Sequence, residues 1–558
     1  MLRIRKTLAA AALAASACAV LAAPRPRVVV LISIDQFRGD YLTRYPDLML
    51  PAKGKDGVGG FRYLEDNGAF FPCAHYTHFP LYTGPGHAVL STGGTPSTEG
   101  IIGNNWYVPG MAKGTSVYCV EDPKYPIVGS TEMKMGVSPR NLRSSTVADE
   151  LKMATGARAK VLTVSFKDRA AVLLAGRLSD CTIWYDSNTG QWVSSKFYCK
   201  DGTLPEWVQA VNSQRLPDAY FNKTWEPLLP GKVAENTWMP LPEAVTPSST
   251  IGKRFPHTYN GGATTPGKAF YGDLWTSPFA TEVVLKTALA GVQAMGIGQD
   301  ETPDFVGINL AANDYVGHAF GPNSAEAFDI TLRSDRALAD FFRALDKQVP
   351  GGLKNVLITV SGDHGVAPIP ECMEEAGFHA GRVTDDAMDS AADSALDAAF
   401  GADDWVAANV EPEMWLNPDA IARHKVDPRE ARRVAAEAVR KTPGVYNALT
   451  SDQLLEGRLP VDFIYKKVAT GYHPKVSGDL MVVTENLWVQ GGGNGGTTHG
   501  TPWAYDTHLP IVMCGPGIQP GRYNSSASPQ QIAPTLAAIL GVNPPSACTA
   551  SPLAEAMQ

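Results

Sequence analysis

The sequence predicts an α/β fold with a doubly wound, mostly parallel sheet and inserted cap segments. Three observations support this prediction. Continuous β-branched runs recur along the chain, amphipathic helical stretches alternate with them, and several of the runs end in polar residues. A continuous apolar run is typical of a strand buried on both faces, and strand–helix alternation is typical of a parallel sheet that helices cover on both sides.

The individual elements follow in chain order. The predicted strands are "RVVVLISID" (27–35), "KVLTVSFK" (160–167), "DFVGINLAAND" (304–314), "NVLITVSGDHG" (355–365) and, more weakly, "LPIVMCGPGI" (509–518). Amphipathic helices are predicted for residues 324–348 and 529–540. Segments 185–268 and 367–490 break this rhythm with tryptophan, proline and mixed charge. We expect both segments to be insertions that build the walls of a site within a domain spanning 24–558.

The composition limits the possible partners. The chain has 558 residues, of which 44% are hydrophobic and 19% are charged, as expected for a folded protein with a large core. Its formal net charge of -8 gives no support for nucleic acid or an anionic membrane as partner. A site for anions would therefore need its own local positive charge.

The N-terminus has the pattern of an export signal over residues 1–23. Basic residues come first, an apolar stretch follows, and small residues surround Ala22 and Ala23. Cys18 raises lipidation as an alternative, but Ala15 stands where such sites usually carry leucine. No later segment offers about 18 continuous apolar residues, so no stable membrane span is expected. The expected location is periplasmic or secreted.

Eight cysteines are present, and removal of the leader with Cys18 would leave seven. Export permits disulfides, and the odd number leaves at least one free thiol. Cys181 and Cys199 flank two alternating stretches around an Asn-Thr-Gly turn, and this pair is the favoured disulfide. No cysteine pair has zinc-finger spacing, so a metal would need oxygen and nitrogen ligands.

Six aspartates and histidines follow the predicted strands or a glycine-rich loop. They are Asp35, Asp314 and His318 in "NDYVGH", Asp363 and His364 in "SGDHG", and His499 in "GGGNGGTTHG". A spacing of four brings Asp314 and His318 to one side of a helix. Any one of these residues alone is better explained as a turn or a satisfied polar group. Together, three carboxylates and three imidazoles are enough for two zinc ions with open positions for substrate.

Thr83 in "LYTGPGHAVLSTGG" allows two interpretations. Threonine is a common helix cap. Alternatively, it is a nucleophile at a helix N-terminus, where backbone N–H groups and the helix dipole favour an anion such as phosphate. We expect His87, four residues later, to pack or hydrogen-bond within the same helix.

The ordered series Asp35, "TGPGH", "GNN", "DYVGH", "GDHG" and "THGTP" resembles the alkaline phosphatase superfamily over nearly the whole mature chain. Its order and spacing are similar to the branch of nucleotide pyrophosphatase/phosphodiesterases and PafA-type phosphatases. The resemblance implies an alkaline phosphatase-like sheet with one zinc ion on Asp314, His318 and His499. It assigns Asp35, Asp363, His364 and the Thr83 oxygen to the second zinc ion, with Thr83 as nucleophile forming a phosphothreonine. Gly-Pro-Gly follows Thr83, whereas a Phe-Pro-Asn tripeptide is common in the diesterases.

Lys167 and Arg169 in "SFKDR" are two apart, so in an extended segment both side chains would point to the same side. One interpretation is a solvated pair at a strand end. With Asn104, which lies 21 residues after Thr83, the pair instead resembles PafA-type phosphomonoesterases. These three groups would stabilise the additional charged oxygen of a monoester dianion. The sequence thus predicts an exported, metal-dependent phosphate monoesterase for small-molecule phosphate esters.

The sequence leaves other functions as alternatives to a phosphate monoesterase. A phosphodiesterase or nucleotide pyrophosphatase is the main alternative. A sulfatase would need a Cys/Ser-x-Pro-x-Arg motif at the Thr83 position, and cofactor-independent phosphoglycerate mutases use serine and are cytoplasmic. A non-catalytic metal-binding protein is a remote alternative, since fold does not guarantee function, but no ligand or nucleophile position is lost here.

Overall fold

The computed structural model describes residues 25–237, 250–491 and 495–558. The predicted export signal over residues 1–23, with Cys18, lies outside the described residues. Within the described residues, no helix combines the length and the apolar character that crossing a membrane requires.

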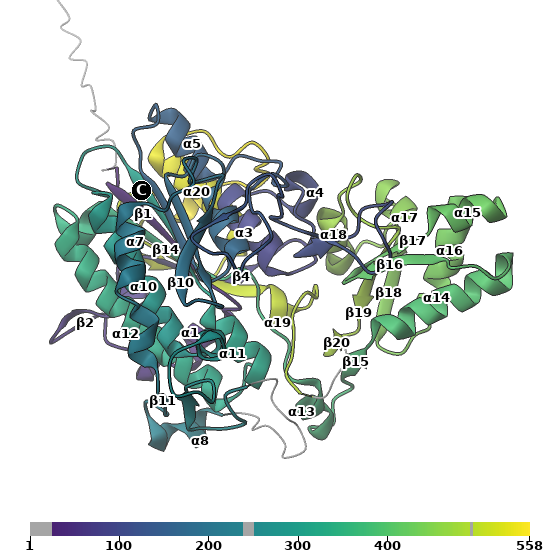
Figure 1. The fold of residues 1–558 in the computed structure, drawn as a ribbon, viewed down its shortest axis with the longest axis horizontal. Helices are drawn as coiled ribbons and strands as arrows, with labels where there is room; N and C mark the ends of the chain where they lie inside the picture. Colours follow the sequence, from purple (N-terminus) through teal and green to yellow (C-terminus); the bar gives the residue numbers. More distant parts are fainter. Residues whose placement is uncertain (1–24, 238–249, 492–494) are drawn as a thin grey trace, which may run out of the picture.

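A ten-stranded sheet forms the centre of the molecule (Figure 1), in the order β22-β4-β21-β14-β1-β13-β8-β9-β10-β7. The strands are β1 Val28–Ile34, β4 Ala69–His75, β7 Ile127–Val128, β8 Val161–Ser165, β9 Cys181–Asp186, β10 Gln191–Ser195, β13 Asp304–Leu310, β14 Val356–Ser361, β21 His508–Cys514 and β22 Gly521–Arg522. Strands β14, β1, β13, β8 and β9 run parallel. Strands β21 and β10 are antiparallel to their neighbours. The predicted mostly parallel α/β fold is therefore confirmed.

The central strand β1 is buried on both faces because successive side chains alternate between two cores. Val28, Val30, Ile32 and Ile34 pack into one hydrophobic cluster, whereas Val29 and Leu31 pack into another. Strands β13 and β14 divide their side chains between the same two clusters. This arrangement explains why the sequence of β1 is continuously apolar rather than alternating.

Helices cover both faces of the sheet (Figure 1). Helices α10 (Pro278–Ala294) and α12 (Ala325–Gln348) contribute to the first cluster. Helices α3 (Thr83–Thr92), α5 (Val147–Ala154), α6 (Asp168–Ala175) and α20 (Ile532–Leu540) contribute to the second. The predicted helix 324–348 begins as expected, because the Ser324 side chain accepts a hydrogen bond from the Ala327 N–H. The predicted helix 529–540 begins with a 3-10 turn, Pro529–Gln531.

A separate four-stranded sheet, β16-β17-β19-β18, forms the green lobe at the right of Figure 1. Its elements are α14 Asp385–Phe400, β16 Val406–Val410, β17 Glu413–Leu416, α15 Pro418–His424, α16 Pro428–Val439, β18 Val445–Thr450, α17 Ser451–Leu455, α18 Phe463–Gly471 and β19 Leu480–Thr484. This lobe has a hydrophobic cluster of its own. It lies within the predicted insertion 367–490, but the division of the chain into units at 185–268 and 367–490 stays a prediction.

Shorter elements surround these two sheets. They are α1 Tyr41–Arg44, β2 Lys53–Gly54, β3 Gly57–Val58, α2 Phe61–Asn67, α4 Pro96–Glu99, β5 Asn105–Trp106, β6 Val117–Tyr118, α7 Glu206–Ser213, β11 Lys223–Trp225, α8 Val233–Asn236, β12 His257–Tyr259, α9 Lys268–Asp273, α11 Ala312–Phe320, α13 Pro370–Glu375, β15 Gly381–Val383, β20 Trp488–Gln490 and α19 Ala504–Thr507. The predicted strand 304–314 therefore ends at Leu310, and its last residues start α11.

The predicted Cys181–Cys199 disulfide is absent, since both residues are free cysteines. The hairpin that suggested it does form, with β9 and β10 pairing from Gln191 opposite Asp186. Strand β10 ends at Ser195, however, and the chain then turns, so that the Cys199 N–H donates to the Ser195 carbonyl. Cys199 thus lies beyond the strand and outside the cross-strand register of Cys181.

Candidate active site and metal centre

The six predicted ligand residues meet at one edge of the central sheet. Strand β1 pairs in parallel with β13, with Ile34 opposite Leu310, and with β14, with Ser33 opposite Ser361. The three strands therefore end at the same level. The residues that follow them, together with a loop from the C-terminal part of the chain, converge there, as expected at the carboxyl ends of parallel strands.

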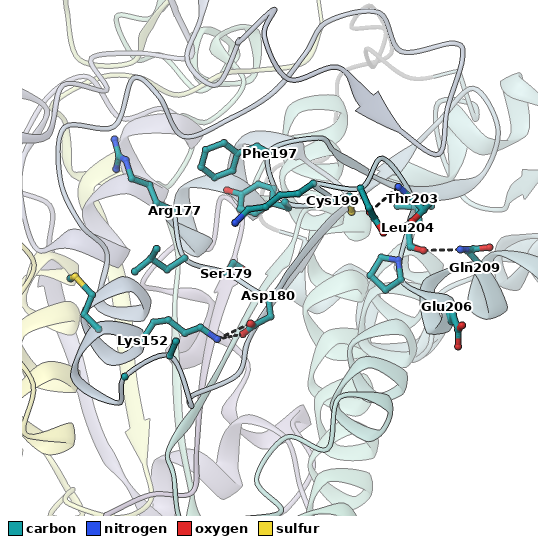
Figure 2. Close-up of a pocket in the computed structure, with 18 residues that line it drawn as sticks. Lys152, Arg177, Ser179, Asp180, Phe197, Cys199, Thr203, Leu204, Glu206 and Gln209 are labelled. Carbon is teal, nitrogen blue, oxygen red and sulfur yellow. Dashed lines mark hydrogen bonds and ion pairs between the residues drawn. The ribbon is translucent and has the colours of Figure 1, made fainter.

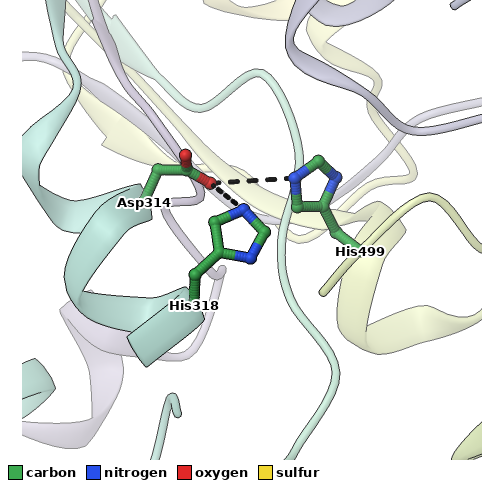
Figure 3. Close-up of side chains that lie close together, drawn as sticks. All are labelled: Asp314, His318 and His499. Carbon is green, nitrogen blue, oxygen red and sulfur yellow. Dashed lines mark ion pairs between the residues drawn. The ribbon is translucent and has the colours of Figure 1, made fainter. Parts of the chain in front are cut away.

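Asp314, His318 and His499 form a first triad (Figure 3). Asp314 and His318 are one turn apart on α11, and His318 Nε2 lies 3.1 Å from Asp314 Oδ1. His499 Nε2 lies 3.7 Å from the same oxygen. The spacing of four in the sequence thus produces the shared face that it predicts.

Asp35, Asp363 and His364 form a second triad, and all three side chains are fully buried. His364 Nε2 lies 3.2 Å from Asp363 Oδ2 and 3.4 Å from Asp35 Oδ1. The two triads touch, because the His364 and His499 rings stack with their centroids 3.5 Å apart.

Backbone carbonyls orient the three imidazoles. The Nδ1 atoms of His318, His364 and His499 lie 2.7, 3.0 and 2.7 Å from the carbonyl oxygens of Thr497, Gly365 and Leu81, respectively. Each Nδ1–H can donate a hydrogen bond to its carbonyl. The Nε2 atom then carries the free lone pair and faces the carboxylates. Metal-bound histidines are typically held by such an outer hydrogen bond.

The donor set and its electrostatics fit divalent metal ions. Asp35 Oδ1 and Asp363 Oδ2 are buried and have no hydrogen-bond partner among the described residues. Burial raises the pKa of Asp35, and the neighbouring Asp363 carboxylate raises it further. A buried cluster of carboxylates is costly unless cations balance it. In the described part of the chain, every group of three or more His, Cys, Asp or Glu residues that could hold a metal lies here.

Thr83 is the first residue of α3 and is buried beside the second triad. Its helix-cap interpretation is wrong, because Tyr82 occupies the cap position and α3 has no side-chain cap hydrogen bond. The Thr83 hydroxyl instead lies 3.4 Å from His364 Nε2 and 3.3 Å from both Lys167 Nζ and Arg169 Nη2. Its oxygen is thus shared between an imidazole and two cations.

Close packing of α3 against the second triad depends on glycine. A Cβ atom at Gly86 would lie 2.2 Å from the Asp363 carbonyl oxygen, so a larger residue would push the helix away. On the other side of the helix N-terminus, the Gly84 N–H donates to Asn104 Oδ1 at 2.8 Å. Because this contact uses the amide oxygen of Asn104, its Nδ2 amino group is not engaged by it and keeps its capacity to donate.

Lys167 and Arg169 reach Thr83 by a different backbone geometry from the one predicted. Strand β8 ends at Ser165, Lys167 is the cap residue of α6, and Arg169 lies in the first turn of that helix. The extended segment is therefore wrong, although the two side chains do converge. The solvated-pair interpretation is wrong as well, since the Lys167 side chain is 1% exposed.

Lys167 also links the two triads. Its Nζ lies 2.9 Å from Asp35 Oδ2 and 2.6 Å from Asp314 Oδ2. Burial alone lowers the pKa of Lys167, but the Asp314 and Asp35 carboxylates outweigh it and raise that pKa. The lysine is therefore held in its charged form beside Thr83.

Four residues that contact the site residues are not predicted from the sequence. The Tyr118 hydroxyl donates to Asp168 Oδ1 at 2.5 Å and accepts from Arg169 Nη1 at 3.3 Å. The Tyr315 ring lies under Lys167 Nζ, 5.3 Å from its centroid. Asn309 and Gln36 contact predicted ligands through their side-chain amides. None of the four stands in a recognisable pattern, although Gln36 directly follows Asp35.

His87 lies as the sequence predicts, with two further contacts. Its Nδ1 is 2.8 Å from the Thr83 carbonyl within α3 and 3.3 Å from Asp363 Oδ2. Its Nε2 lies 3.0 Å from the Asn309 side-chain amide. The imidazole thus contacts a predicted ligand, and with Asp35 and Asp363 it forms one of the candidate metal groups.

A concave region of 1110 Å³ lies elsewhere, between α5 and the residues that follow β10 (Figure 2). Three of its charged groups are satisfied within the protein. Lys152 Nζ lies 2.6 Å from Asp180 Oδ2, and Arg177 donates to the carbonyl oxygens of Leu142 and Ser144. The candidate metal groups described above are not part of it.

Comparison with known proteins gives a family and a set of relatives. Residues 29–508 match the family described as type I phosphodiesterase / nucleotide pyrophosphatase. The chain is 35% identical to alkaline phosphatase PafA of Elizabethkingia meningoseptica over 540 residues, covering 96% of this chain and 95% of that protein. It is 34% identical to alkaline phosphatase PhoV of Synechococcus elongatus, with 94% and 91% coverage.

Solved structures of PafA are similar to this fold. The wild-type crystal structure superposes with a TM-score of 0.85 at 33% identity, covering 96% of this chain and 99% of that chain. A PafA variant in which one threonine, one asparagine, one lysine and one arginine are replaced gives the same TM-score.

Proposed function

The chain belongs to the type I phosphodiesterase/nucleotide pyrophosphatase family and is a phosphoric monoester hydrolase, and we propose that it works through a phosphothreonine formed on Thr83. One observation carries this proposal. The Thr83 hydroxyl lies at a helix N-terminus with Lys167 Nζ and Arg169 Nη2 both 3.3 Å away. A threonine oxygen flanked by two cations suits an attacking group beside an anionic phosphoryl group.

The reaction is a displacement at phosphorus followed by hydrolysis. The Thr83 hydroxyl loses its proton, its Oγ forms a bond to phosphorus, and the ester bond to the leaving oxygen breaks, with one proton taken up by that oxygen so that an alcohol departs. Water then attacks the phosphothreonine, the bond from phosphorus to Thr83 Oγ breaks, and a proton from the water restores the Thr83 hydroxyl as inorganic phosphate is released. Lys167, Arg169 and the Asn104 amino group hold the unsubstituted phosphoryl oxygens through both steps.

Two zinc ions complete the proposed centre. Asp314, His318 and His499 would hold one ion, and Asp35, Asp363 and His364, with the Thr83 oxygen, would hold the other. When bound, such ions supply Lewis-acid stabilisation of the attacking and leaving oxygens. The orphaned carboxylate oxygens and the carbonyl-fixed imidazoles support this part of the proposal.

The proposed substrates are small phosphate monoesters. A monoester dianion presents one more unsubstituted oxygen than a diester, and the two cations beside Thr83 suit that additional charge. The replaced threonine, asparagine, lysine and arginine of the PafA variant are the same residue types as Thr83, Asn104, Lys167 and Arg169. The family name favours a phosphodiesterase as the second candidate.

We also propose that the protein is exported, to the periplasm or beyond. The basic, apolar and small-residue pattern of residues 1–23 supports this proposal. Fractionation of the native host with an antibody to the protein would test it. Recovery of the protein in the cytoplasm with residues 1–23 still attached would contradict export.

One experiment separates the two enzymatic candidates. Turnover of a monoester and a diester with the same leaving group is measured with and without a chelator. We expect faster turnover of the monoester and loss of both activities when the metal is removed. A higher kcat/KM for the diester would instead support the phosphodiesterase.

A further inference from the structure

Gln36 contacts one carboxylate of each triad. Its backbone N–H donates to Asp363 Oδ1 at 3.0 Å, and its side-chain Nε2 donates to Asp314 Oδ1 at 2.7 Å. The residue is fully buried and directly follows Asp35, which is itself a member of the second triad. A single residue therefore links the two candidate metal sites through two different groups.

The backbone of Gln36 is held in a conformation that glutamine rarely adopts. Its φ of 60° lies in the left-handed region, which is unfavourable for most residues that carry a side chain. The Asn313 side chain stabilises this turn by donating to the carbonyl oxygens of Asp35 and Gln36 at 2.9 and 3.0 Å. The turn directs the N–H toward Asp363 and leaves the side chain beside α11.

Helix α11 has space for the Gln36 amide because Gly317 lies beside it. A Cβ atom at Gly317 would lie 1.6 Å from Gln36 Oε1, so any larger residue there would displace the amide. Asp314 and Gly317 are three residues apart and thus share a face of the helix. The ionised Asp314 carboxylate only accepts hydrogen bonds, which explains why the Nε2 end of the amide faces it.

We propose that Gln36 is a positioning residue that sets the relative placement of the two metal sites, an inference that rests on the proposed zinc centre. Its side chain fixes the Asp314 carboxylate of the first triad, and its backbone N–H fixes the Asp363 carboxylate of the second. Loss of an outer hydrogen bond to a metal ligand typically lowers metal affinity by about 10–100-fold. The two contacts can be separated, because only one depends on the side chain.

The variant Gln36→Asn tests this separation. Asparagine tolerates the left-handed region and keeps the backbone N–H, but its side chain is one methylene shorter and does not reach Asp314. We expect one zinc equivalent to be removed at a chelator concentration about 10–100-fold lower than in the parent protein. The other equivalent should be removed at the parental concentration. Metal content measured after dialysis against graded chelator gives this result without an activity assay.

Two further variants keep the test decisive. Gln36→Gly removes the side chain and relieves the backbone strain, and we expect the same selective loss of one equivalent. Gln530→Asn is the matched control, since Gln530 is buried and its Nε2 bonds to Gly93 and Thr549, away from both triads. It should bind both zinc ions as the parent does.

The outcomes distinguish this inference from the proposed function. Parental affinity for both ions in Gln36→Asn and Gln36→Gly would overturn the positioning role. Equal loss of both ions, together with a lower unfolding midpoint of the metal-free protein, would assign Gln36 to general stability instead. A parent that binds no divalent metal at all would contradict the zinc centre itself.

Discussion

Two regions of this molecule, the cavity beside α5 and the candidate metal centre, differ in how their charges are balanced. In the cavity beside α5, Lys152 is paired with Asp180, and Arg177 is satisfied by backbone carbonyls. At the edge of the central sheet, the Asp35 and Asp363 carboxylates each keep a buried oxygen without a hydrogen-bond partner among the described residues. A buried polar group without a partner requires an explanation, and a bound ion is one of them. The unpartnered carboxylate oxygens, together with the candidate metal groups at the same edge, therefore distinguish this region from the 1110 Å³ cavity as a candidate metal centre.

The largest expected effect comes from the proposed nucleophile, Thr83. Thr83→Ala removes the oxygen that forms the bond to phosphorus, and kcat/KM for a monoester should fall by several orders of magnitude. Thr83→Ser keeps a hydroxyl and should retain part of the activity. Thr92→Ala is the control, because Thr92 is buried in the same helix and its hydroxyl bonds to the Ala88 carbonyl and the Gly94 N–H, not to the site residues. Normal hydrolysis by Thr83→Ala would remove Thr83 from the mechanism.

Mass spectrometry gives an independent measurement. A phosphorylated intermediate trapped by rapid acid quench should carry its phosphate on the peptide that contains Thr83. Phosphate on a different peptide would contradict the assignment even if Thr83→Ala were inactive.

The next largest effect is expected at the second triad. Asp363→Ala removes a carboxylate that would both coordinate an ion and neutralise its charge, so the variant should lose one zinc equivalent and most of its turnover. Elemental analysis of the purified variant beside the parent measures the metal, and a monoester assay measures the turnover. Two full equivalents of zinc in the variant would show that Asp363 is not a ligand.

A smaller and more selective effect is expected from the two cations. Replacing Lys167 and Arg169 with alanine should lower monoester turnover more than diester turnover, by about 3 kcal/mol or more in transition-state stabilisation. The reason is that only the monoester carries the additional charged oxygen. Lys113→Ala, which removes an exposed lysine paired with Asp404, is the control for loss of positive charge. Equal losses on both substrates would favour the phosphodiesterase.

The smallest kinetic effect is expected in the cavity beside α5. Lys152→Ala breaks the ion pair with Asp180 and the hydrogen bond to the Ala159 carbonyl. Because the Lys152 side chain is mostly buried, the free energy of unfolding should fall by about 1–2 kcal/mol, while kcat/KM stays at the parental value. Denaturant unfolding and a monoester assay measure the two quantities. A large loss of turnover at unchanged stability would indicate a function for this cavity.

The sequence carried enough information to predict the edge at which the ligands meet. Continuous apolar runs predict buried parallel strands, and parallel strands that are neighbours end at the same edge of the sheet. Asp35, Asp314 and Asp363 could therefore be grouped without knowledge of the strand order. The i,i+4 spacing likewise predicts that Asp314 and His318 share one helical face, and both lie on α11.

Local geometry was predicted less well where two backbone conformations satisfy the same pattern. Lys167 and Arg169 were expected in an extended segment, yet the chain turns into α6 after Ser165, and both side chains still reach Thr83. The absence of the predicted Cys181–Cys199 disulfide has a related cause. The alternating pattern of the hairpin does not determine where β10 ends or how the chain turns after it.

By itself, the sequence determined the types of ligand, their order along the chain and the strands that carry them, because these depend on side-chain chemistry and short-range periodicity. Tertiary structure alone decided which groups support them. Gln36 meets Asp314 and Asp363 across 278 and 327 residues of sequence. Arg169 meets the Tyr118 hydroxyl, and Lys167 lies between the two triads. Contacts over such separations depend on how strands order in the sheet and how helices pack on it, and no local pattern in the sequence encodes that packing.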